Sequence, residues 1–261
     1  MKALILSISS DIGIALTNTL LKKGYEIYGT YKRKKPNINI PNANFFQLDI
    51  KDFDSTKFKN WLKTIGNWDL FISCIGTLEP VGELINIDLN EWVNAIAENS
   101  SYQIAALINA IKIRPKKNYA SVILFAGGGT NSATPNYSSY TLGKISLIKA
   151  VELLDKEINY IKFSIIGPGW VKTKIHKETL NAKENAGLNY SKTLEMINNP
   201  DKFNPMDKVI NDVCKIISLP KDLVGGRNFS SVHDNLSFKN LKKLKDLNVD
   251  FYKLRRSHNE K

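Results

Sequence analysis

Residues 3–31, ALILSISSDIGIALTNTLLKKGYEIYGTY, decide the fold class of this chain. The apolar run Ala3–Leu6 predicts a buried strand, and a small polar turn follows it. Ile12–Lys23 has the apolar spacing of a helix, and Gly24 is suited to its C-terminal cap. Tyr25–Tyr31 is aromatic and β-branched, which predicts a second strand. The stretch therefore predicts a strand, a helix and a strand that runs parallel to the first.

The same alternation continues without a linker to about residue 166. Further strands are expected at Asn44–Leu48, Asp69–Ser73, Ser121–Phe125 and Lys162–Ile166. Helices between them are expected at Asp52–Ile65, Leu89–Ile113 and Ser139–Leu154. This order predicts an α/β fold in three layers, with a doubly wound, Rossmann-like parallel sheet between two layers of helices.

We expect residues 1–261 to form one domain, because the alternation is unbroken. Residues 170–200 are polar and irregular, and we expect them to form a substrate lid. Asn204–Leu219 predicts a helix and Val224–Ser230 a last strand. From about Phe238 to residue 261 the pattern indicates a basic helical tail.

The formal net charge is +12, and lysines cluster at Lys32–Lys35 and Lys239–Lys245. Basic proteins can bind nucleic acid, anionic lipid or acidic small molecules. Basic and aromatic residues do not interleave as they do in single-strand binders, so a solvated lysine-rich surface is favoured over nucleic-acid binding. Binding of nucleic acid by the basic tail remains a minor hypothesis.

The two cysteines, Cys74 and Cys214, form no CxxC pair and no metal-ligand cluster with the three histidines. Reduced thiols in the cytoplasm and the absence of a metal site are the expectation. No segment has the apolar length that a bilayer span requires, so no membrane partner is expected. His176, in a lysine-rich stretch, is interpreted as a loop residue rather than a catalyst.

Small, polar and charged residues collect after the predicted strands. In an open parallel sheet, ligands bind at this carboxyl edge. The segments are Ser7–Gly13, Tyr31–Lys35, Asp49, Cys74–Gly76, Gly127–Thr130 and Gly167–Trp170. The serines and Gly13 in the first turn suit a phosphate at a helix N-terminus, although most glycines of a dinucleotide fingerprint are missing.

The end of the second strand favours NADPH over NADH. An NAD site usually places a carboxylate there for the ribose 2′-hydroxyl, whereas an NADP site needs cations for the 2′-phosphate. Here Tyr31 is followed by Lys32 and Arg33, so the local charge is positive.

Tyr140 and Lys144 are spaced so that they share one face of the predicted helix. A tyrosine hydroxyl has an ordinary pKa of about 10, and a neighbouring ammonium is expected to lower it. The pair could then protonate a carbonyl oxygen during hydride transfer, or do the reverse. The same spacing recurs within residues 28–35, so spacing alone does not identify a reactive pair.

The order of these features resembles the short-chain dehydrogenase/reductase family, in its shorter single-domain branch, from Ala3 to about Ser230. The resemblance implies a dinucleotide-binding domain in a homodimer or homotetramer. It implies cofactor contacts from Ser7, Ser9, Ser10, Asp11, Ile12, Tyr31, Lys32, Arg33, Asp49, Ile50, Cys74, Ile75, Gly76, Tyr140, Lys144, Pro168, Gly169, Val171 and Thr173.

The resemblance also implies roles. Asp49 matches an acid that contacts adenine, and Ser73–Gly76 stands where the family carries Asn-Asn-Ala-Gly. Asn99 matches the helix asparagine that holds a proton-relay water. Tyr140–Lys144 matches the YxxxK pair, whose lysine contacts the nicotinamide ribose. Pro168–Thr173 matches a PG motif whose threonine contacts the carboxamide.

Two departures from the family pattern stand out. Ser7 and Asp11 replace the first two glycines of the phosphate turn. Gly127 stands where the family has its catalytic serine, and Thr130 or Ser132 is the expected substitute. The expected catalytic set is therefore Tyr140, Lys144, Asn99 and Thr130.

The lysine-rich stretch Lys172–Lys177 would favour an anionic substrate by electrostatic attraction. The glycine loop and Tyr252–Arg256 also resemble family members associated with surface-polysaccharide gene clusters. The leading hypothesis is an NADPH-dependent oxidoreductase that reduces a carbonyl, or oxidises the alcohol, of a polar anionic substrate such as a nucleotide sugar or polysaccharide precursor. Alternatives are a 3-oxoacyl carrier-protein-type reductase and a non-catalytic nucleotide-binding or scaffold protein with the same fold.

Overall fold

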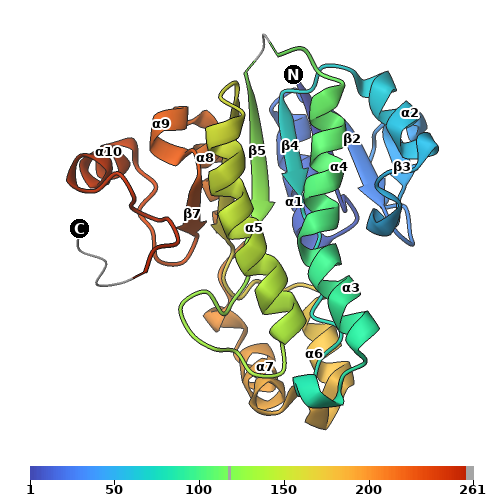
Figure 1. Ribbon diagram of the computed structural model, residues 1–261, viewed down its shortest axis with the longest axis vertical. Helices are drawn as coiled ribbons and strands as arrows, with labels where there is room; N and C mark the ends of the chain where they lie inside the picture. Colours follow the sequence, from blue (N-terminus) through green and yellow to red (C-terminus); the bar gives the residue numbers. More distant parts are fainter. Residues whose placement is uncertain (117–118, 257–261) are drawn as a thin grey trace.

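A seven-stranded parallel sheet forms the centre of the protein (Figure 1). The computed structural model describes residues 1–116 and 119–256. The strands are β1 (Lys2–Leu6), β2 (Glu26–Tyr31), β3 (Phe45–Gln47), β4 (Leu70–Ser73), β5 (Ala120–Phe125), β6 (Ile161–Gly167) and β7 (Arg227–Ser230). Their order is β3-β2-β1-β4-β5-β6-β7, so the direction of winding reverses beside β1. The predicted fold class is confirmed.

Helices cover both faces of the sheet. They are α1 (Asp11–Lys22), α2 (Thr56–Ile65), α3 (Leu89–Asn99), α4 (Ser101–Lys112), α5 (Ser138–Glu157), α6 (His176–Ala182), α7 (Leu188–Asn198), α8 (Met206–Ser218), α9 (Lys221–Val224) and α10 (Phe238–Leu247). Short 3₁₀ turns occupy Asn42–Asn44, Ile50–Asp52, Leu84–Asn86, Lys183–Ala186 and Pro200–Lys202. Within the described residues, no helix is long and apolar enough to cross a bilayer.

Alternating side chains of each strand feed two separate cores. Leu4 and Leu6 pack with α2, α4 and α5 on one face. Ala3 and Ile5 pack with α1, α8 and α9 on the other. Because successive strand residues point to opposite faces, both faces of β1 must be apolar, as the run Ala3–Leu6 predicted.

The single helix predicted over Leu89–Ile113 is in fact two helices. Ser100 lies between α3 and α4 with φ −143°, outside the helical region. Its hydroxyl donates to Ile96 O at 2.5 Å, and this hydrogen bond gives a carbonyl group at the end of α3 a partner. The helix predicted from Asp52 also starts later, at Thr56, because Ser55 caps it.

Residues 170–200 are not irregular as predicted, because they contain α6 and α7. The buried faces of these two helices are polar, so the sequence lacks the apolar periodicity that would have predicted them. Thr193 is buried and donates to Asn189 O at 2.8 Å. Asn189 in turn donates to Pro135 O at 2.8 Å, which holds α7 against the loop before α5. The last strand also starts later than predicted, because Lys221–Val224 forms α9.

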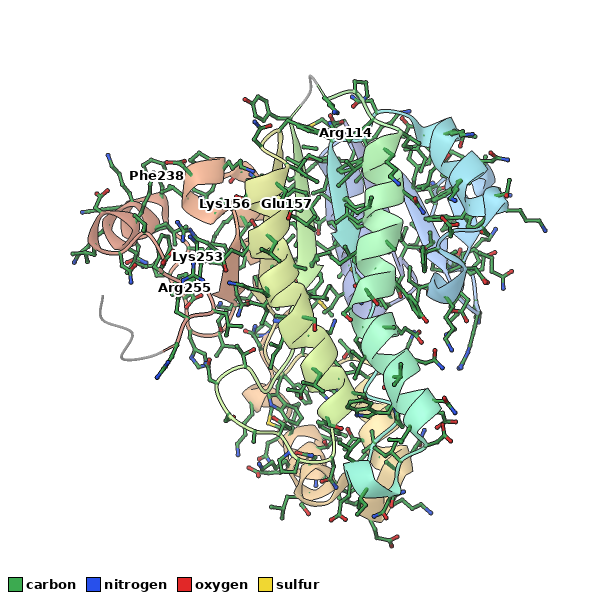
Figure 2. The ribbon with its side chains drawn as sticks, in the orientation of Figure 1. Arg114, Lys156, Glu157, Phe238, Lys253 and Arg255 are labelled. Atoms are coloured by element: carbon green, nitrogen blue, oxygen red, sulfur yellow. The ribbon has the colours of Figure 1, made fainter. Side chains whose placement is uncertain are left out.

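The C-terminal segment after α10 lies along β7 and is not helical as predicted. Asn228 N–H donates to Tyr252 O at 2.8 Å. The buried Arg227 guanidinium donates to Val249 O at 3.1 Å and Phe251 O at 2.9 Å, and lies 3.8 Å from the centre of the Phe251 ring. Figure 2 labels Lys253 and Arg255 in the same segment. The predicted tail extends to residue 261, and residues 257–261 lie outside the described residues.

Candidate active site

The turn after β1 is tightly folded around Gly13. Ser10 caps α1 and accepts from Gly13 N–H at 3.0 Å. A Cβ added to Gly13 would lie 2.7 Å from Ser7 O, so only glycine fits there. Ser7 has φ +57°, the left-handed region that glycine prefers. Ser9 lies in this turn and Ile12 in the first turn of α1.

Asp11 joins this turn to the segment after β6. Its carboxylate accepts from Lys174 N–H at 2.7 Å and lies 3.6 Å from Lys174 Nζ. Thr173 is therefore held beside the start of α1. Pro168 O accepts from Asn204 Nδ2 at 2.7 Å, and Val171 is buried, so the segment between them is fixed on the β6 side.

At the end of β2, Lys32 is engaged by two carboxylates. Its Nζ lies 3.2 Å from Asp49 Oδ2 and 3.2 Å from Glu98 Oε1. Burial acts to raise the pKa of Asp49, but hydrogen bonds from Lys51 N–H and Lys32 lower it overall. Arg33 is exposed at the same strand end. The predicted positive charge is present, but part of it is neutralised within the protein.

Lys144 lies almost completely buried between the ends of β4 and β5, with 3% of its surface exposed. Its ammonium donates to Ile75 O at 2.9 Å and to Phe125 O at 3.1 Å. A Cβ added to Gly76 would lie 3.4 Å from Nζ, so the missing side chain keeps this side of the ammonium open. Burial lowers the pKa of Lys144 to about 8 and raises that of the neighbouring Cys74 to about 12.

Tyr140 lies against the glycine loop, in the space that a side chain at position 127 would need. A Cβ added to Gly127 would lie 2.6 Å from Cε1 and Cζ of Tyr140. Gly129 packs just as closely on the next residue of α5, because its added Cβ would lie 2.6 Å from Thr141 Cγ2. Gly128 has no atom within 4 Å of the same position. The loop carries glycine at 127 and 129 because it rests directly on the first turn of α5.

The pKa of Tyr140 is raised to about 12, contrary to the expectation that Lys144 lowers it. Burial is the main cause, and the charges of Glu178 and Tyr137 add to it. Lys144 Nζ lies 5.7 Å from the centre of the Tyr140 ring and donates to two carbonyl groups instead. Thr130 is half-buried in the turn after the glycines, and no hydrogen bond among the described residues links its side chain to Tyr140.

Asn99 clamps the segment that follows β4. Its Oδ1 accepts from Thr77 N–H at 3.2 Å, and its Nδ2 donates to Thr77 O at 2.9 Å and Ala95 O at 3.0 Å. A Cβ added to Gly143 would lie 2.6 Å from Asn99 Cβ, so glycine there lets α5 approach Asn99. The structure thus brings Asn99, Gly76 and Lys144 together.

Two further residues, missed in the sequence, border this cluster. Glu178 on α6 accepts at Oε2 from Leu78 N–H at 2.6 Å and from the Thr77 hydroxyl at 3.2 Å. Tyr137 shares a hydrogen bond of 2.5 Å with Thr179. A single glutamate after several lysines carried no signal that its side chain turns toward the end of β4.

His176 is held by its neighbours. Its ring stacks on Trp170 with centroids 5.2 Å apart, and its Nε2 donates to Val171 O at 2.8 Å. These contacts occupy both the ring face and Nε2, and they give His176 a structural role at the start of α6.

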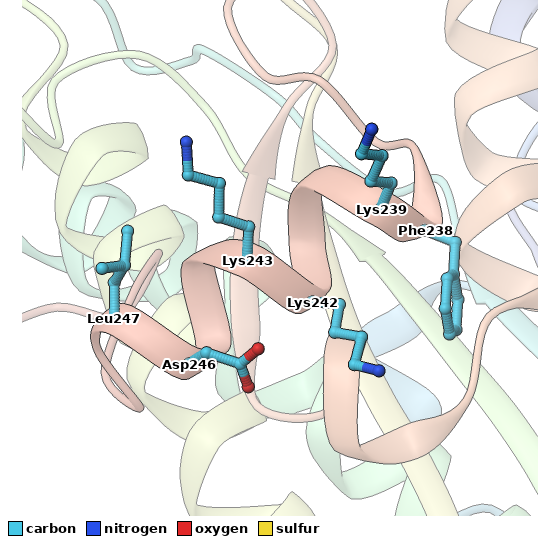
Figure 3. A pocket seen from close by; sticks show the side chains of 6 residues that line it. All are labelled: Phe238, Lys239, Lys242, Lys243, Asp246 and Leu247. Atoms are coloured by element: carbon cyan, nitrogen blue, oxygen red, sulfur yellow. The ribbon is translucent and has the colours of Figure 1, made fainter.

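A separate hollow of about 430 Å³ lies on α10 (Figure 3). It is lined by Phe238, Lys239, Lys242, Lys243, Asp246 and Leu247. The lysines of the predicted basic tail therefore gather on an exposed helix face. This is the surface on which the hypothesis of nucleic-acid binding rests, and it is separate from Tyr140 and Lys144 on α5.

Comparison with known proteins identifies the family. Residues 8–199 match the family described as enoyl-(acyl carrier protein) reductase. The chain belongs to the short-chain dehydrogenase/reductase family. Members are NAD(P)-dependent oxidoreductases, and this chain is one of them.

Individual relatives agree with this assignment. The 3-oxoacyl-[acyl-carrier-protein] reductase FabG of Buchnera aphidicola is 29% identical over 240 residues, covering 86% of this chain and 92% of the relative. The short-chain dehydrogenase/reductase YIR035C from Saccharomyces cerevisiae has a TM-score of 0.77 at 20% identity, covering 90% of this chain and 98% of that one. A small-chain dehydrogenase in complex with NADPH has a TM-score of 0.69 at 17% identity, with 88% and 95% covered.

The residues present fit a bound dinucleotide. The tight turn at Gly13 leads into the N-terminus of α1, where backbone N–H groups attract phosphate. Asp49 lies just after β3, and Gly76 leaves room beside the Lys144 ammonium. These groups occupy the carboxyl edge of the sheet, at the reversal of winding beside β1.

Proposed function

We propose that this short-chain dehydrogenase/reductase uses NADPH to reduce a ketone in a polar, anionic substrate. The main support is the buried Lys144 ammonium, held by Ile75 O and Phe125 O one helical turn after Tyr140. When bound, the nicotinamide supplies the hydride. Tyr140 donates the proton from Oη to the substrate's carbonyl oxygen.

The protonation state of Tyr140 suits the acid role that reduction requires. With its pKa raised to about 12, Tyr140 is protonated at neutral pH and can act as an acid. Lys144, with a pKa of about 8, keeps most of its positive charge at pH 7 and stabilises negative charge left on Tyr140. Asn99 holds Thr77 in place beside these groups, and we propose that it also keeps the path for the returning proton open.

Tyr140→Phe tests this assignment once a substrate is found in a screen of ketones and nucleotide sugars. We expect turnover to fall by at least about a hundredfold, because a general acid contributes that much or more. Tyr119→Phe is the matched control, since Tyr119 is 81% exposed. Unchanged turnover in Tyr140→Phe would contradict the mechanism. NADPH binding with no ketone reduced would favour the scaffold alternative.

The preference for NADPH rests on Arg33 more than on Lys32. Lys32 is already paired with Asp49 and Glu98, whereas Arg33 is exposed at the same strand end. We expect Arg33→Ala to weaken NADPH binding about tenfold in calorimetry and to leave NADH binding unchanged. Lys34→Ala is the control. A wild-type preference for NADH would refute this part of the proposal.

Two substrate classes have support. Exposed lysines at positions 172 and 177 would attract an anionic group at the outside of α6, as in a nucleotide sugar or polysaccharide precursor. The 29% identity to FabG supports a 3-oxoacyl group on a carrier as the second candidate. Parallel assays with a keto-sugar nucleotide and acetoacetyl-CoA would separate the two.

We further propose that residues 170–200 close over the substrate and that the protein works in the cytoplasm as a homodimer or homotetramer. Exposed apolar side chains on adjacent helices support the association. Val93 on α3 is 57% exposed, and Leu142 and Leu153 on α5 are 44% and 52% exposed. Sedimentation of wild type against Leu153→Lys would test this interface, and a monomeric wild type would refute it.

A further inference from the structure

Glu178 stands closer to the reactive cluster than its place in a lysine-rich segment suggests. It reaches from α6 to Thr77 and Leu78, directly after β4. Thr77 is the residue that Asn99 clamps, and Gly76 before it lies beside the Lys144 ammonium. Thr77 thus links the Glu178 carboxylate to Asn99, which lies beside Lys144.

The same helix is fixed to the first turn of α5. Thr179 and Tyr137 share a hydrogen bond of 2.5 Å, and Tyr137 lies one helical turn before Tyr140. The negative charge of Glu178 contributes to the raised pKa of both tyrosines, which agrees with its closeness to them. Glu178 is therefore close enough to Tyr140 for its charge to act on the hydroxyl.

The positive and negative side chains of residues 172–178 face different ways. Lys172, Lys174 and Lys177 are exposed, and Lys174 is paired with Asp11. Glu178 is partly buried and turned toward the end of β4. The segment therefore presents positive charge to the outside and negative charge toward the end of β4.

A carboxylate only accepts hydrogen bonds. The bonds from Leu78 N–H and the Thr77 hydroxyl both reach Oε2, and Glu79 N–H is a third donor to the carboxylate. A carboxylate has about four lone-pair sites, so it keeps acceptor capacity for another donor. A hydroxyl beside the substrate's carbonyl could donate to it, and bonds to charged groups are the stronger kind. A second carbonyl, a carboxylate or a phosphate at that place would be repelled.

We propose, on the basis of the reductase function above, that Glu178 is a specificity-determining residue that selects ketones with a hydroxyl next to the carbonyl, as in a keto sugar. Any anionic group of such a substrate lies farther away, toward the exposed lysines. A 3-oxoacyl thioester has a CH2 group next to its ketone and a thioester carbonyl one carbon further on, so it has no hydroxyl to donate to Glu178 and is disfavoured.

Three small ketones of nearly equal size test the proposal. The second substituent on the carbonyl carbon is CH2OH in hydroxyacetone, an ethyl group in butanone and a carboxylate in pyruvate. Acetoacetyl-CoA represents the thioester class. We expect wild type to show a kcat/KM at least about tenfold higher for hydroxyacetone than for butanone, the size of one charge-assisted hydrogen bond. Pyruvate should be the poorest of the three small ketones.

Glu178→Gln removes the charge and keeps an acceptor for Leu78 N–H. We expect the hydroxyacetone-to-butanone ratio to fall toward one and pyruvate to improve relative to both. Glu184→Gln, an exposed change in the same segment, should leave every ratio unchanged. Glu178→Asp keeps the charge, and it should keep the order of preference even if turnover falls.

The outcomes distinguish the role of Glu178 from the reductase function. If Glu178 only anchors α6, Glu178→Gln will lower all rates together and keep their ratio, which refutes the specificity role. Equal reduction of hydroxyacetone and butanone by wild type refutes it as well, whether or not the variants fold. If wild type binds NADPH yet reduces none of the four probes, the reductase function itself fails.

Discussion

Replacing Gly127 with alanine should displace Tyr140, because the two residues occupy adjoining space. The added Cβ would stand 2.6 Å from Cε1 and Cζ of the tyrosine ring, where ordinary contact begins at 3.4 Å. The ring must therefore move by about 1 Å or strain its surroundings. Gly128→Ala is a matched control in the same loop, since no atom lies within 4 Å of its added Cβ.

The expected cost follows from that overlap. Overpacking of this size destabilises by about 2 kcal/mol, which lowers the melting temperature of a chain this long by about 4–8 °C. If the ring moves instead, stability is spared but the hydroxyl is misplaced by about 1 Å, which costs about a hundredfold in rate. Either way, Gly127→Ala must lose stability or turnover, and Gly128→Ala must lose neither.

Thermal unfolding followed by circular dichroism and NADPH-dependent turnover together measure both effects. If Gly127→Ala matches Gly128→Ala in melting temperature and in turnover, then Tyr140 does not rest on position 127. The explanation of the missing serine as space taken by the tyrosine ring would then be wrong.

Three more predictions concern the framework. Gly13→Ala should lower the melting temperature by about 6–12 °C, since its Cβ would meet Ser7 O, a main-chain atom that cannot yield easily; a shift below about 2 °C would contradict the tight turn. Arg227→Met should cost about 3 kcal/mol in urea unfolding, because three carbonyl groups, two of them in buried hydrogen bonds, lose a charged donor; an unchanged free energy of unfolding would refute this role of Arg227. Arg255 lowers the pKa of Glu152 from 4.5 to about 2, so its stabilisation is complete above pH 4.5 and disappears as the pH falls toward 2. Arg255 also pairs with Asp250, whose lowered pKa keeps that carboxylate charged at pH 2. Arg255→Ala should therefore lose more stability at pH 7 than near pH 2, where only the pair with Asp250 remains, and a constant difference across this range would count against the pair with Glu152.

The sheet could be predicted from the sequence because each central strand is apolar on both faces. Ala3–Leu6 is one example, and local composition alone marks it. The break at Ser100 could not be predicted, because the Asn99 side chain at that point bonds Thr77, far away in sequence. The helices within residues 170–200 were missed because threonine and asparagine, rather than leucine, fill their buried face.

The sequence predicted which residues form the candidate site, but not how these residues contact one another. Chain order alone led to Tyr140, Lys144 and Asn99, and the structure brings Lys144 and Asn99 together beside Gly76. The raised pKa of Tyr140 depends on burial, which no spacing rule measures. Glu178 was missed because its partners become its neighbours only in the folded chain.

The segment that follows α10 determines where the sheet ends. An uncovered edge strand exposes N–H and C=O groups to which another chain can add a strand. Tyr252 O accepts the hydrogen bond from Asn228 N–H on β7. Arg227 holds the covering segment in place because its guanidinium donates to two carbonyl groups of that segment. The opposite edge, β3, is only three residues long and gives little to pair with. Both edges of the described sheet therefore offer little to an added strand, and truncation before residue 248 would open β7 to strand addition and aggregation.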